Sequence, residues 1–548
     1  MVDASISDRL IENIERRSRG AFYTPIIWAD YAHKLITEQF GSGWKDDYIV
    51  WDCCCGTKNL TRDYRFKELY CSTLEQAELD ISKNYNKEAT SFQFDFLNDS
   101  LDDLKVKAPG LLNAFENNRP IMFFINPPYV KPNGANGNAS QSSNVCKEMH
   151  TIDGFKQSEL TYQFLWRILN IKRTFNLTNC CIACFTKSTW LCCESTKKFR
   201  KLFVQHFKFT NGIMFNASEF ADVSARWGIT FNMWRPGECN NKNEFEHTIV
   251  QSNKNSDIEI IGAYTLYNTD NIDHIQTSKY ISQDVKKTET ITNGIIFKPI
   301  NKSYTITKTK VPKDRFDIAM CIHGDMIQNN RKCYITAGIP AGGIILNKDN
   351  IIKACMILAI KLTTLRNWLN DKDSYIIDPH KKYPIEFITD CFTYALFSNY
   401  AVSMHFDDGS LRNDLFWMSK DDIEQLAKQY NNIQCLDDIK LADNNRFAYN
   451  KLIEWSDILS QESKDIVSTT KSFVINSFQY REMFNESHPE YQINNWDAGW
   501  YQLKSLLKIY MPDDLKAFRT LHKQLGNKIK QQVYELGILR DTFKSICK

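Results

Sequence analysis

The sequence lacks the long uncharged apolar run that a membrane-spanning helix requires. No stretch approaches the roughly 18 uncharged apolar residues that mark such a helix. The first residues, MVDASISDRLIENIERRSRG, are polar and carry both signs of charge, so they do not resemble a secretory signal peptide. We therefore expect a cytoplasmic protein without a membrane segment.

Two glycine-rich phosphate loops are also missing. The sequence contains no GxGxxG, the fingerprint of dinucleotide-binding folds, and no GxxxxGKS/T, the loop that holds the phosphates of ATP or GTP. A ligand without a pyrophosphate is therefore favoured. Lys58 stands where a glycine would let the backbone approach a dinucleotide closely, which supports the same conclusion.

A strong excess of charge is absent too, whereas cysteine is plentiful. The formal net charge is +3, which neither indicates nor excludes a nucleic-acid partner, because a large protein can carry a local positive cleft. Of the 17 cysteines, Cys181, Cys184, Cys192 and Cys193 have spacings that would suit zinc. Residues 180–185 read as a buried strand, however, and no second CxxC or HxxxH supports a closed site. We expect reduced thiols and no metal.

The length of 548 residues predicts two or three domains. Apolar segments such as DYIVWDCCCG, IMFFINPPY and NCCIACFTK alternate with helical stretches such as KQSELTYQFLWRILNIKR. This alternation favours an α/β fold with a doubly wound, mostly parallel sheet. After Pro236 the composition becomes polar and turn-rich, and helical periodicity returns near the end. We expect domains over 1–239, 240–480 and 481–548.

The segment IMFFINPPY places two prolines directly behind a continuous apolar run. Such a run suits a strand buried on both faces, and the prolines cannot continue its ladder because neither has an N–H group. Residues 126–129 should therefore form a stiff turn at the carboxyl end of a strand, where open α/β sheets bind ligands. A rigid loop without a ligand is the alternative. The Gly/Asn/Ser-rich residues 131–144 that follow would suit either a lid or a plain surface loop.

Acidic residues close the other expected strands. Asp52 ends the first strand before a turn, and Asp95 ends the third beside Phe96. Glu75 ends the second strand, 19 residues after Gly56, and in dinucleotide folds an acid about 20 residues on binds the ribose hydroxyls. One strand-end acid is often only a helix cap. The ordered series predicts an adenosine-bearing ligand along the carboxyl edge of the sheet, with Asp95 at the adenine amino group.

These segments resemble the motifs of the amino-group DNA methyltransferases of the order called gamma, which use S-adenosylmethionine. GAFYTP looks like their N-terminal cofactor motif, WDCCCGTKNL like their first motif, NPPY like their catalytic motif and IACFTKSTWL like their fifth-strand motif. The resemblance covers residues 18–235. Cys53, Cys54 and Lys58 depart from the family pattern in the cofactor loop.

The resemblance implies a role for each matched residue. The expected cofactor-binding residues are Phe22, Tyr23, Thr24, Asp52, Cys54, Gly56, Glu75, Asp95, Phe96 and Phe164. The expected catalytic residues are Asn126, Pro127, Pro128 and Tyr129, and the residues expected to stack on the target base are Tyr129 and Phe220. The family requires no metal.

The same resemblance implies a Rossmann-like class I methyltransferase sheet of seven strands with an antiparallel last hairpin, followed by a mixed α+β target-recognition region. It implies transfer of a methyl group from S-adenosylmethionine to N6 of a flipped-out adenine in double-stranded DNA, as in site-specific enzymes of restriction-modification systems. The alternatives are methylation of cytosine N4, RNA or protein glutamine, and a non-catalytic DNA-binding component of a defence complex. Any restriction or specificity subunit would be a separate partner chain.

Basic residues of the C-terminal part are candidates for contacts to DNA phosphates. In the expected recognition region these are Lys308, Lys310, Lys313, Arg315, Arg331 and Lys332. The lysine-rich faces of the last helical segments are instead predicted to be solvated helix surface.

Overall fold

The computed structural model describes residues 23–129, 143–157, 159–220, 225–253, 255, 257–283, 292–298, 303–309, 318–337, 343–401, 404–407, 410–413, 415–429, 446–488 and 496–545. Phe22, Lys310, Lys313 and Arg315 lie outside these residues, as does most of the 131–144 segment. The chain forms two compact units. The first contains residues 1–272, 367–373 and 542–548, and the second contains 273–366 and 374–541.

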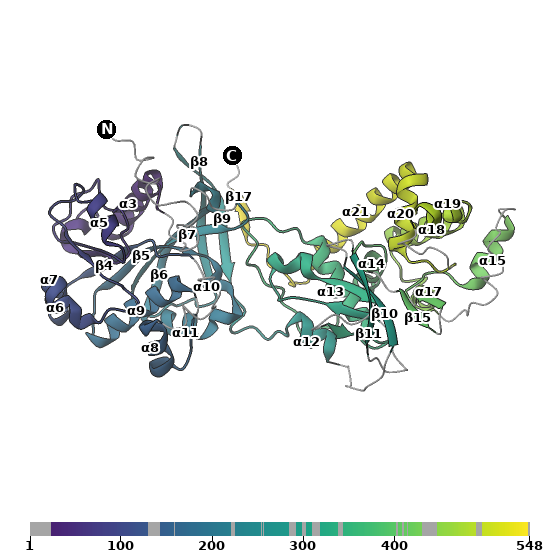
Figure 1. The fold of residues 1–548 in the computed structure, drawn as a ribbon, viewed down its shortest axis with the longest axis horizontal. Helices are drawn as coiled ribbons and strands as arrows, with labels where there is room; N and C mark the ends of the chain where they lie inside the picture. Colours follow the sequence, from purple (N-terminus) through teal and green to yellow (C-terminus); the bar gives the residue numbers. More distant parts are fainter. Residues whose placement is uncertain are drawn as a thin grey trace. The chain divides into compact units, whose positions relative to one another are not determined.

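The first unit is built on one sheet of ten strands (Figure 1), in the order β17-β9-β8-β6-β7-β5-β4-β1-β2-β3. The strands are β1 (Ile49–Asp52), β2 (Leu69–Thr73), β3 (Thr90–Gln93), β4 (Ile121–Ile125), β5 (Cys180–Lys187), β6 (Phe207–Asn216), β7 (Gly228–Pro236), β8 (Glu244–Ser252), β9 (Ile258–Tyr267) and β17 (Phe543–Ser545).

Neighbouring strands from β3 to β5 are parallel, whereas β7 runs antiparallel to both β5 and β6. The expected α/β class and the antiparallel hairpin are therefore present. The count of seven strands is not confirmed, because β8, β9 and β17 continue the sheet beyond β6. Of these three, β8 is parallel to β6, and the other two pairings are antiparallel.

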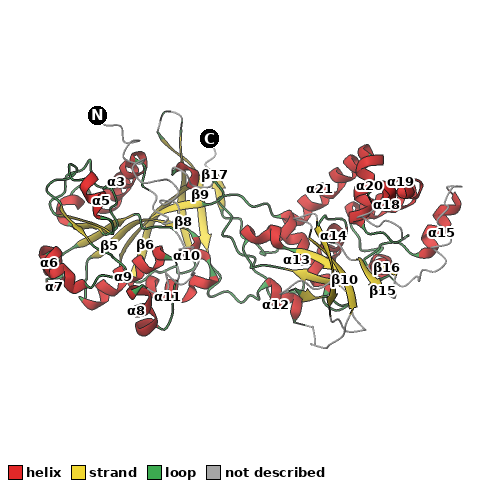
Figure 2. Cartoon of the chain, viewed as in Figure 1, coloured by secondary structure: helices red, strands yellow, loops and turns green. Residues whose placement is uncertain are grey.

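Helices cover both faces of this sheet (Figure 2). They are α3 (Ile26–Phe40), α4 (Trp44–Asp47), α5 (Gln76–Ile81), α6 (Leu104–Lys107), α7 (Pro109–Glu116), α8 (Asn144–Asp153), α9 (Leu160–Thr174), α10 (Thr189–Cys192) and α11 (Lys197–His206). The apolar run of β4 explains this arrangement. Ile121, Phe123 and Ile125 belong to one hydrophobic cluster, whereas Met122 and Phe124 belong to the other. A strand with no polar side needs cover on both faces.

The second unit is a mixed α+β assembly with two small sheets. Their strands are β10 (Thr292–Lys298), β11 (Ser303–Thr309), β15 (Met404–Asp407) and β16 (Ser410–Asn413) in one, and β12 (Ile318–Cys321), β13 (Tyr334–Ala337) and β14 (Ile344–Ile345) in the other. The helices are α12 (Thr277–Ser282), α13 (Ile351–Thr363), α14 (Ile385–Leu396), α15 (Lys420–Gln429), α17 (Phe447–Glu454), α18 (Gln461–Ser477), α19 (Arg481–Ser487), α20 (Trp500–Tyr510) and α21 (Pro512–Glu535).

Two distant pieces of chain return to the first unit. Strand β17 pairs with β9 in antiparallel register. In the 367–373 segment, Asp373 Oδ2 accepts a hydrogen bond of 2.6 Å from the Tyr264 hydroxyl. The first unit thus extends past residue 239 and takes in the end of the described chain. The assignment of recognition to 240–480 and of a separate segment to 481–548 stays a prediction.

Within the described residues, no helix is both long and apolar enough to cross a membrane. Among the same residues, no three His, Cys, Asp or Glu side chains gather as metal ligands would. Cys180, Cys181 and Cys184 are buried in β5, as the strand interpretation predicts.

Candidate active site at the carboxyl edge of the first sheet

The NPPY turn begins where β4 ends and is held by side chains from three directions. The Asn126 side-chain amide donates to Thr24 Oγ1 at 2.9 Å. The Tyr129 hydroxyl donates to Asn126 Oδ1 at 2.6 Å, and the Thr161 hydroxyl donates to the Pro128 carbonyl at 2.7 Å. The structure therefore brings Asn126 of NPPY and Thr24 of GAFYTP together, although they are 102 residues apart in sequence.

Tyr129 is turned into the protein and is only 2% exposed. Burial raises the pKa of its hydroxyl well above the usual value. Its ring lies edge-on to the Trp227 ring, with centroids 6.0 Å apart. In this arrangement the Tyr129 hydroxyl occupies the side-chain oxygen of Asn126.

Lys187, the last residue of β5, contacts the backbone of the NPPY turn. Its ammonium group donates to the Tyr129 carbonyl. It lies 4.0 Å from Glu159 Oε2 and 5.6 Å from the centroid of the Trp227 ring. Lys187 lies within the IACFTKSTWL match, but the sequence comparison assigned it no role. The sequence feature that could have indicated a role for Lys187 is its position at the end of a buried strand.

Asp52, at the end of β1, is a buried carboxyl group that lacks one hydrogen-bond partner. It is 1% exposed, and its Oδ1 accepts a hydrogen bond of 3.3 Å from the Cys54 amide. Its Oδ2 is buried and has no hydrogen-bond partner among the residues that the structure describes. Burial raises the pKa of Asp52 to about 8. Buried charged groups are normally paired, so this oxygen fits a cationic ligand group.

The turn after Asp52 uses left-handed backbone at two positions. Gly56 has φ +49°, and a Cβ atom there would lie 2.9 Å from the Tyr23 ring. Lys58 has φ 63°, a conformation that costs about 1 kcal/mol for a residue with a side chain. Its ammonium group donates to the Tyr85 carbonyl at 3.1 Å. The backbone at position 58 therefore has the conformation that glycine adopts freely, although the residue is lysine.

Glu78, in α5, is an acid of this site that the sequence comparison missed. It is 7% exposed, and its two carboxylate oxygens accept hydrogen bonds from the Tyr23 hydroxyl at 2.9 Å and the Thr73 hydroxyl at 2.5 Å. Glu75 is half-buried at the N-cap position of α5 and makes no side-chain cap bond. The strand-to-acid spacing predicts Glu75 as the ribose-binding acid, and that role stays a prediction. The sequence feature that could have indicated Glu78 is its position as an acid in the first turn of the helix that follows β2.

Strand β3 ends at Gln93, so Asp95 and Phe96 lie in the turn that follows it rather than at the strand end as expected, and Phe164 lies on α9. Asp95 Oδ1 accepts from the Leu97 and Asn98 amides at 2.9 and 3.2 Å, so the carboxylate caps the following turn. Phe96 and Phe164 stack on each other, with centroids 5.0 Å apart, and both are buried. The role of these residues at an adenine ring stays a prediction.

Phe220 and Trp227 both lie on the connection from β6 to β7, with different exposure. Phe220 is fully buried, and its ring lies 5.9 Å from Phe185 and 5.7 Å from Phe215. Trp227 is half-buried and contacts Tyr129 edge-on. Trp227 therefore lies beside the NPPY turn, and the role of Phe220 at a target base stays a prediction.

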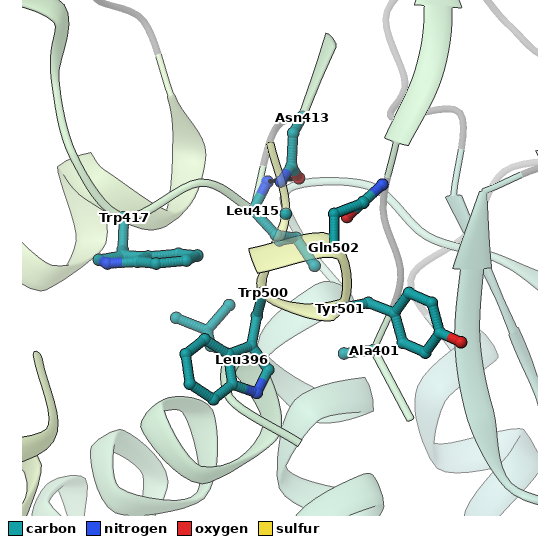
Figure 3. A pocket seen from close by; sticks show the side chains of 9 residues that line it. Leu396, Ala401, Asn413, Leu415, Trp417, Trp500, Tyr501 and Gln502 are labelled. Carbon is teal, nitrogen blue, oxygen red and sulfur yellow. Dashed lines mark hydrogen bonds between the residues drawn. The ribbon is translucent and has the colours of Figure 1, made fainter. Parts of the chain in front are cut away.

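The second unit contains a small pocket, shown in Figure 3. Its walls include Asn413, Trp417, Trp500 and Gln502. The space inside is about 10 Å³, which is room for about one water molecule. This pocket is too small for a nucleotide-sized ligand.

No family model and no curated protein matches this sequence. Among solved structures, one similar chain is a modification subunit of a putative type I restriction enzyme from Vibrio vulnificus, with 13% identity, 46% of this chain and 52% of that chain covered, and a TM-score of 0.29. Another is the methyltransferase subunit of a type I restriction-modification system from Streptococcus thermophilus, with 14% identity, 43% and 50% covered, and a TM-score of 0.30.

A third similar structure is a putative RNA methyltransferase from Pyrococcus horikoshii, with 12% identity, 43% of this chain and 96% of that chain covered, and a TM-score of 0.25. The match spans about half the length of the two restriction-system subunits. Similarities this remote assign no activity to the present chain.

Proposed function

We propose that this protein transfers a methyl group from S-adenosylmethionine to N6 of an adenine flipped out of double-stranded DNA. The observation that carries the proposal is the hydrogen bond between Asn126 and Thr24, which joins NPPY to the N-terminal motif at the carboxyl edge of the sheet. A parallel sheet binds ligands at this edge.

The residues around Asp52 fit the proposed cofactor. The unpartnered Asp52 oxygen would receive the ammonium group of its methionine part. Tyr23, Glu78 and the turn at Gly56 would surround the rest, because Tyr23 and Glu78 both lie against that turn. When bound, the cofactor supplies an electrophilic methyl group.

Asn126 and Pro127 would prepare the substrate amine. The exocyclic nitrogen of adenine is a poor nucleophile because its lone pair is delocalised into the ring. Two oxygen acceptors on its hydrogens, Asn126 Oδ1 and the Pro127 carbonyl, favour a pyramidal nitrogen whose lone pair points at the methyl group. The turn fixes both acceptors beforehand, which is electrostatic preorganisation. Lys187 contributes by holding the Tyr129 carbonyl.

Aromatic side chains would offset the cost of flipping the base, which is a few kcal/mol. Tyr129 would leave Asn126 and stack on one face of the base. Phe220 would have to leave the core to reach the other face, whereas Trp227 is already half-buried beside Tyr129. The proposal therefore assigns the opposite face to Trp227. Each stacked base is worth about 1–3 kcal/mol.

The decisive test is to incubate the protein with methyl-labelled S-adenosylmethionine and mixed-sequence duplex DNA, digest the DNA and identify the labelled nucleoside. Label in N6-methyladenosine is the expected result. Label in N4-methylcytosine would show that the target is cytosine N4 instead of adenine N6. Label only in RNA or protein would show that the substrate is not DNA. Cofactor binding without transfer to any substrate would favour a non-catalytic component.

Asn126→Ala separates the catalytic role from binding. The variant loses the acceptor but none of the groups that face the cofactor, so we expect methyl transfer to be abolished while S-adenosylmethionine still binds with nearly unchanged affinity. Calorimetric titration alongside the transfer assay measures both. Loss of cofactor binding in this variant would refute the assigned role.

A further inference from the structure

The consecutive helices α20 and α21 carry six basic side chains, which we call the basic stripe. Its members are Lys504, Lys508, Lys516, Arg519, Lys523 and Lys530. The two helices follow each other and pack together in the second unit (Figure 1). Lys504 is half-buried, and the other five are exposed.

Helical spacing puts the α21 members on one side of the helix. Positions 516, 519, 523 and 530 are separated by three, four and seven residues, which brings them to one face. The buried residues of α21 include Leu515, Phe518, Leu525 and Ile529 and form another face. At 1.5 Å per residue, the four cations span about 21 Å along the helix.

The stripe lacks carboxylate partners within the described residues. Lys528, on another side of the same helix, shows the contrast, because it lies 2.6 Å from Glu386, 3.0 Å from Asp390 and 3.5 Å from Glu462. In the part of the chain that the structure describes, no stripe member forms an ion pair with a carboxylate. The acids of α21 sit at its two ends, as Asp513, Asp514 and Glu535.

Two stripe members lie close enough to influence each other. Burial, with a smaller contribution from the charge of Arg519, lowers the pKa of Lys504 to about 8. The Lys504 ammonium group donates to the side-chain oxygen of Asn399, an uncharged acceptor. Clustered cations without counter-charges are the electrostatic pattern of a surface that binds a polyanion.

We propose that the basic stripe binds the phosphate backbone of DNA, an inference that rests on the proposed function for the choice of partner. Arg519 and Lys523 are about 6 Å apart along the helix, similar to the spacing of successive phosphates along one strand. The lysine-rich faces were predicted to be solvated helix surface. Five of the six stripe residues are indeed exposed, and the proposal adds a polyanionic ligand to that solvated surface.

The test neutralises three stripe residues and compares the variant with a matched control. The stripe variant is Lys516→Gln, Arg519→Gln and Lys523→Gln. The control is Lys201→Gln, Lys348→Gln and Lys464→Gln, which removes the same charge from exposed positions on other elements. Glutamine is a good helix former, and thermal unfolding confirms that both variants fold like the wild type.

The readout is the affinity for a DNA duplex at several salt concentrations. In the stripe variant, we expect the slope of log affinity against log salt to fall by about one unit for each lost phosphate contact. The control should keep the wild-type slope, and both variants should bind S-adenosylmethionine as the wild type does. Equal slopes in all three proteins would overturn the proposal, as would a control that loses as much as the stripe variant.

The same experiment separates this inference from the proposed function. If the wild type methylates DNA but the stripe variant keeps the wild-type slope, the stripe assignment is wrong and the function stands. If the stripe variant loses salt-dependent DNA binding but the wild type transfers no methyl group, the stripe assignment stands without the activity. A wild type that binds no DNA at any salt concentration overturns the stripe assignment directly.

Discussion

The protonation of Asp52 should control cofactor binding. The folded-state pKa is raised from 3.8 to about 8 by burial, so the ligand-free protein holds a neutral carboxyl group at pH 7. An ammonium group prefers the ionised form, so binding must release the proton. We expect the affinity for S-adenosylmethionine to rise up to tenfold per pH unit between about pH 6 and 7.5, measured by calorimetry. This range lies below that in which an α-ammonium group loses its own proton.

The contribution of Asp52 to the folding stability of the ligand-free protein should fall as the pH rises, whereas the cofactor affinity should increase. Between pH 3.8 and about 8 the unfolded carboxyl group is ionised and the folded one is not, so the contribution of Asp52 falls as pH rises. Asp52→Asn is the control, because it should bind cofactor more weakly and without the pH dependence. A pH dependence that persists in Asp52→Asn would contradict the assignment.

Trp227 should matter more than its place outside the motifs suggests. Trp227→Ala removes a stacking face worth about 1–3 kcal/mol, so we expect kcat/KM for DNA to fall about 10- to 100-fold. Cofactor affinity should stay unchanged, and Trp227→Phe should recover most of the loss. Phe220→Leu is the comparison: because Phe220 is fully buried, it should lower the unfolding temperature instead. A wild-type kcat/KM in Trp227→Ala would exclude the stacking role.

Among the elements, Glu78 connects three parts of the proposed cofactor pocket. Tyr23 precedes α3, Thr73 ends β2, and Glu78 belongs to α5. A hydrogen bond to a charged group contributes about 1.5–3 kcal/mol. We expect Tyr23→Phe and Glu78→Gln each to weaken S-adenosylmethionine binding by about tenfold, with the double variant little weaker than either single one.

A double-mutant cycle measures this connection through cofactor titrations of the four proteins. Tyr64→Phe is a matched control, because its hydroxyl donates to the exposed Asp30 at 2.7 Å on another part of the unit. Strictly additive losses for Tyr23 and Glu78 would mean that the hydrogen bond does not order the pocket.

For the whole molecule, the end of the chain is part of the first unit. Residues 543–545 pair with 262–264 of β9 at the sheet edge. Ending the chain after Asp541 should expose the β9 edge, lower the unfolding temperature of the first unit and promote association through that edge. The expected shift is about 2–4 °C for each kcal/mol lost, measured by calorimetry. Lys544→Gln, which keeps the strand, should unfold like the wild type.

Much of the site could be predicted because it depends on local pattern. The run of β4 has no polar side, so it must be buried on both faces, and two prolines must end it. Parallel neighbours then bring the ends of β1, β2 and β4 to one edge. Asp52 and Asn126 therefore reach the same region without any knowledge of packing.

The choice between neighbouring candidates could not be predicted in this way. Glu75 and Glu78 differ by less than one helical turn, and only the packing of α5 decides that Glu78 meets Tyr23. Likewise, Phe220 is buried whereas Trp227 lies beside Tyr129. In both pairs, the direction in which each side chain points decides which one faces the site. Residue type and sequence spacing do not determine that direction.

The sequence by itself determined the α/β alternation, the turn behind β4 and Asp52 at the end of β1, because each follows from the side-chain period and backbone chemistry of a short segment. Only the tertiary structure decided that the described sheet has ten strands, that residues 367–373 and β17 return to the first unit, and that Lys504 of α20 lies near Arg519 of α21. These features join segments far apart in the chain, and such pairings depend on the free energy of the whole packed unit rather than on any local pattern.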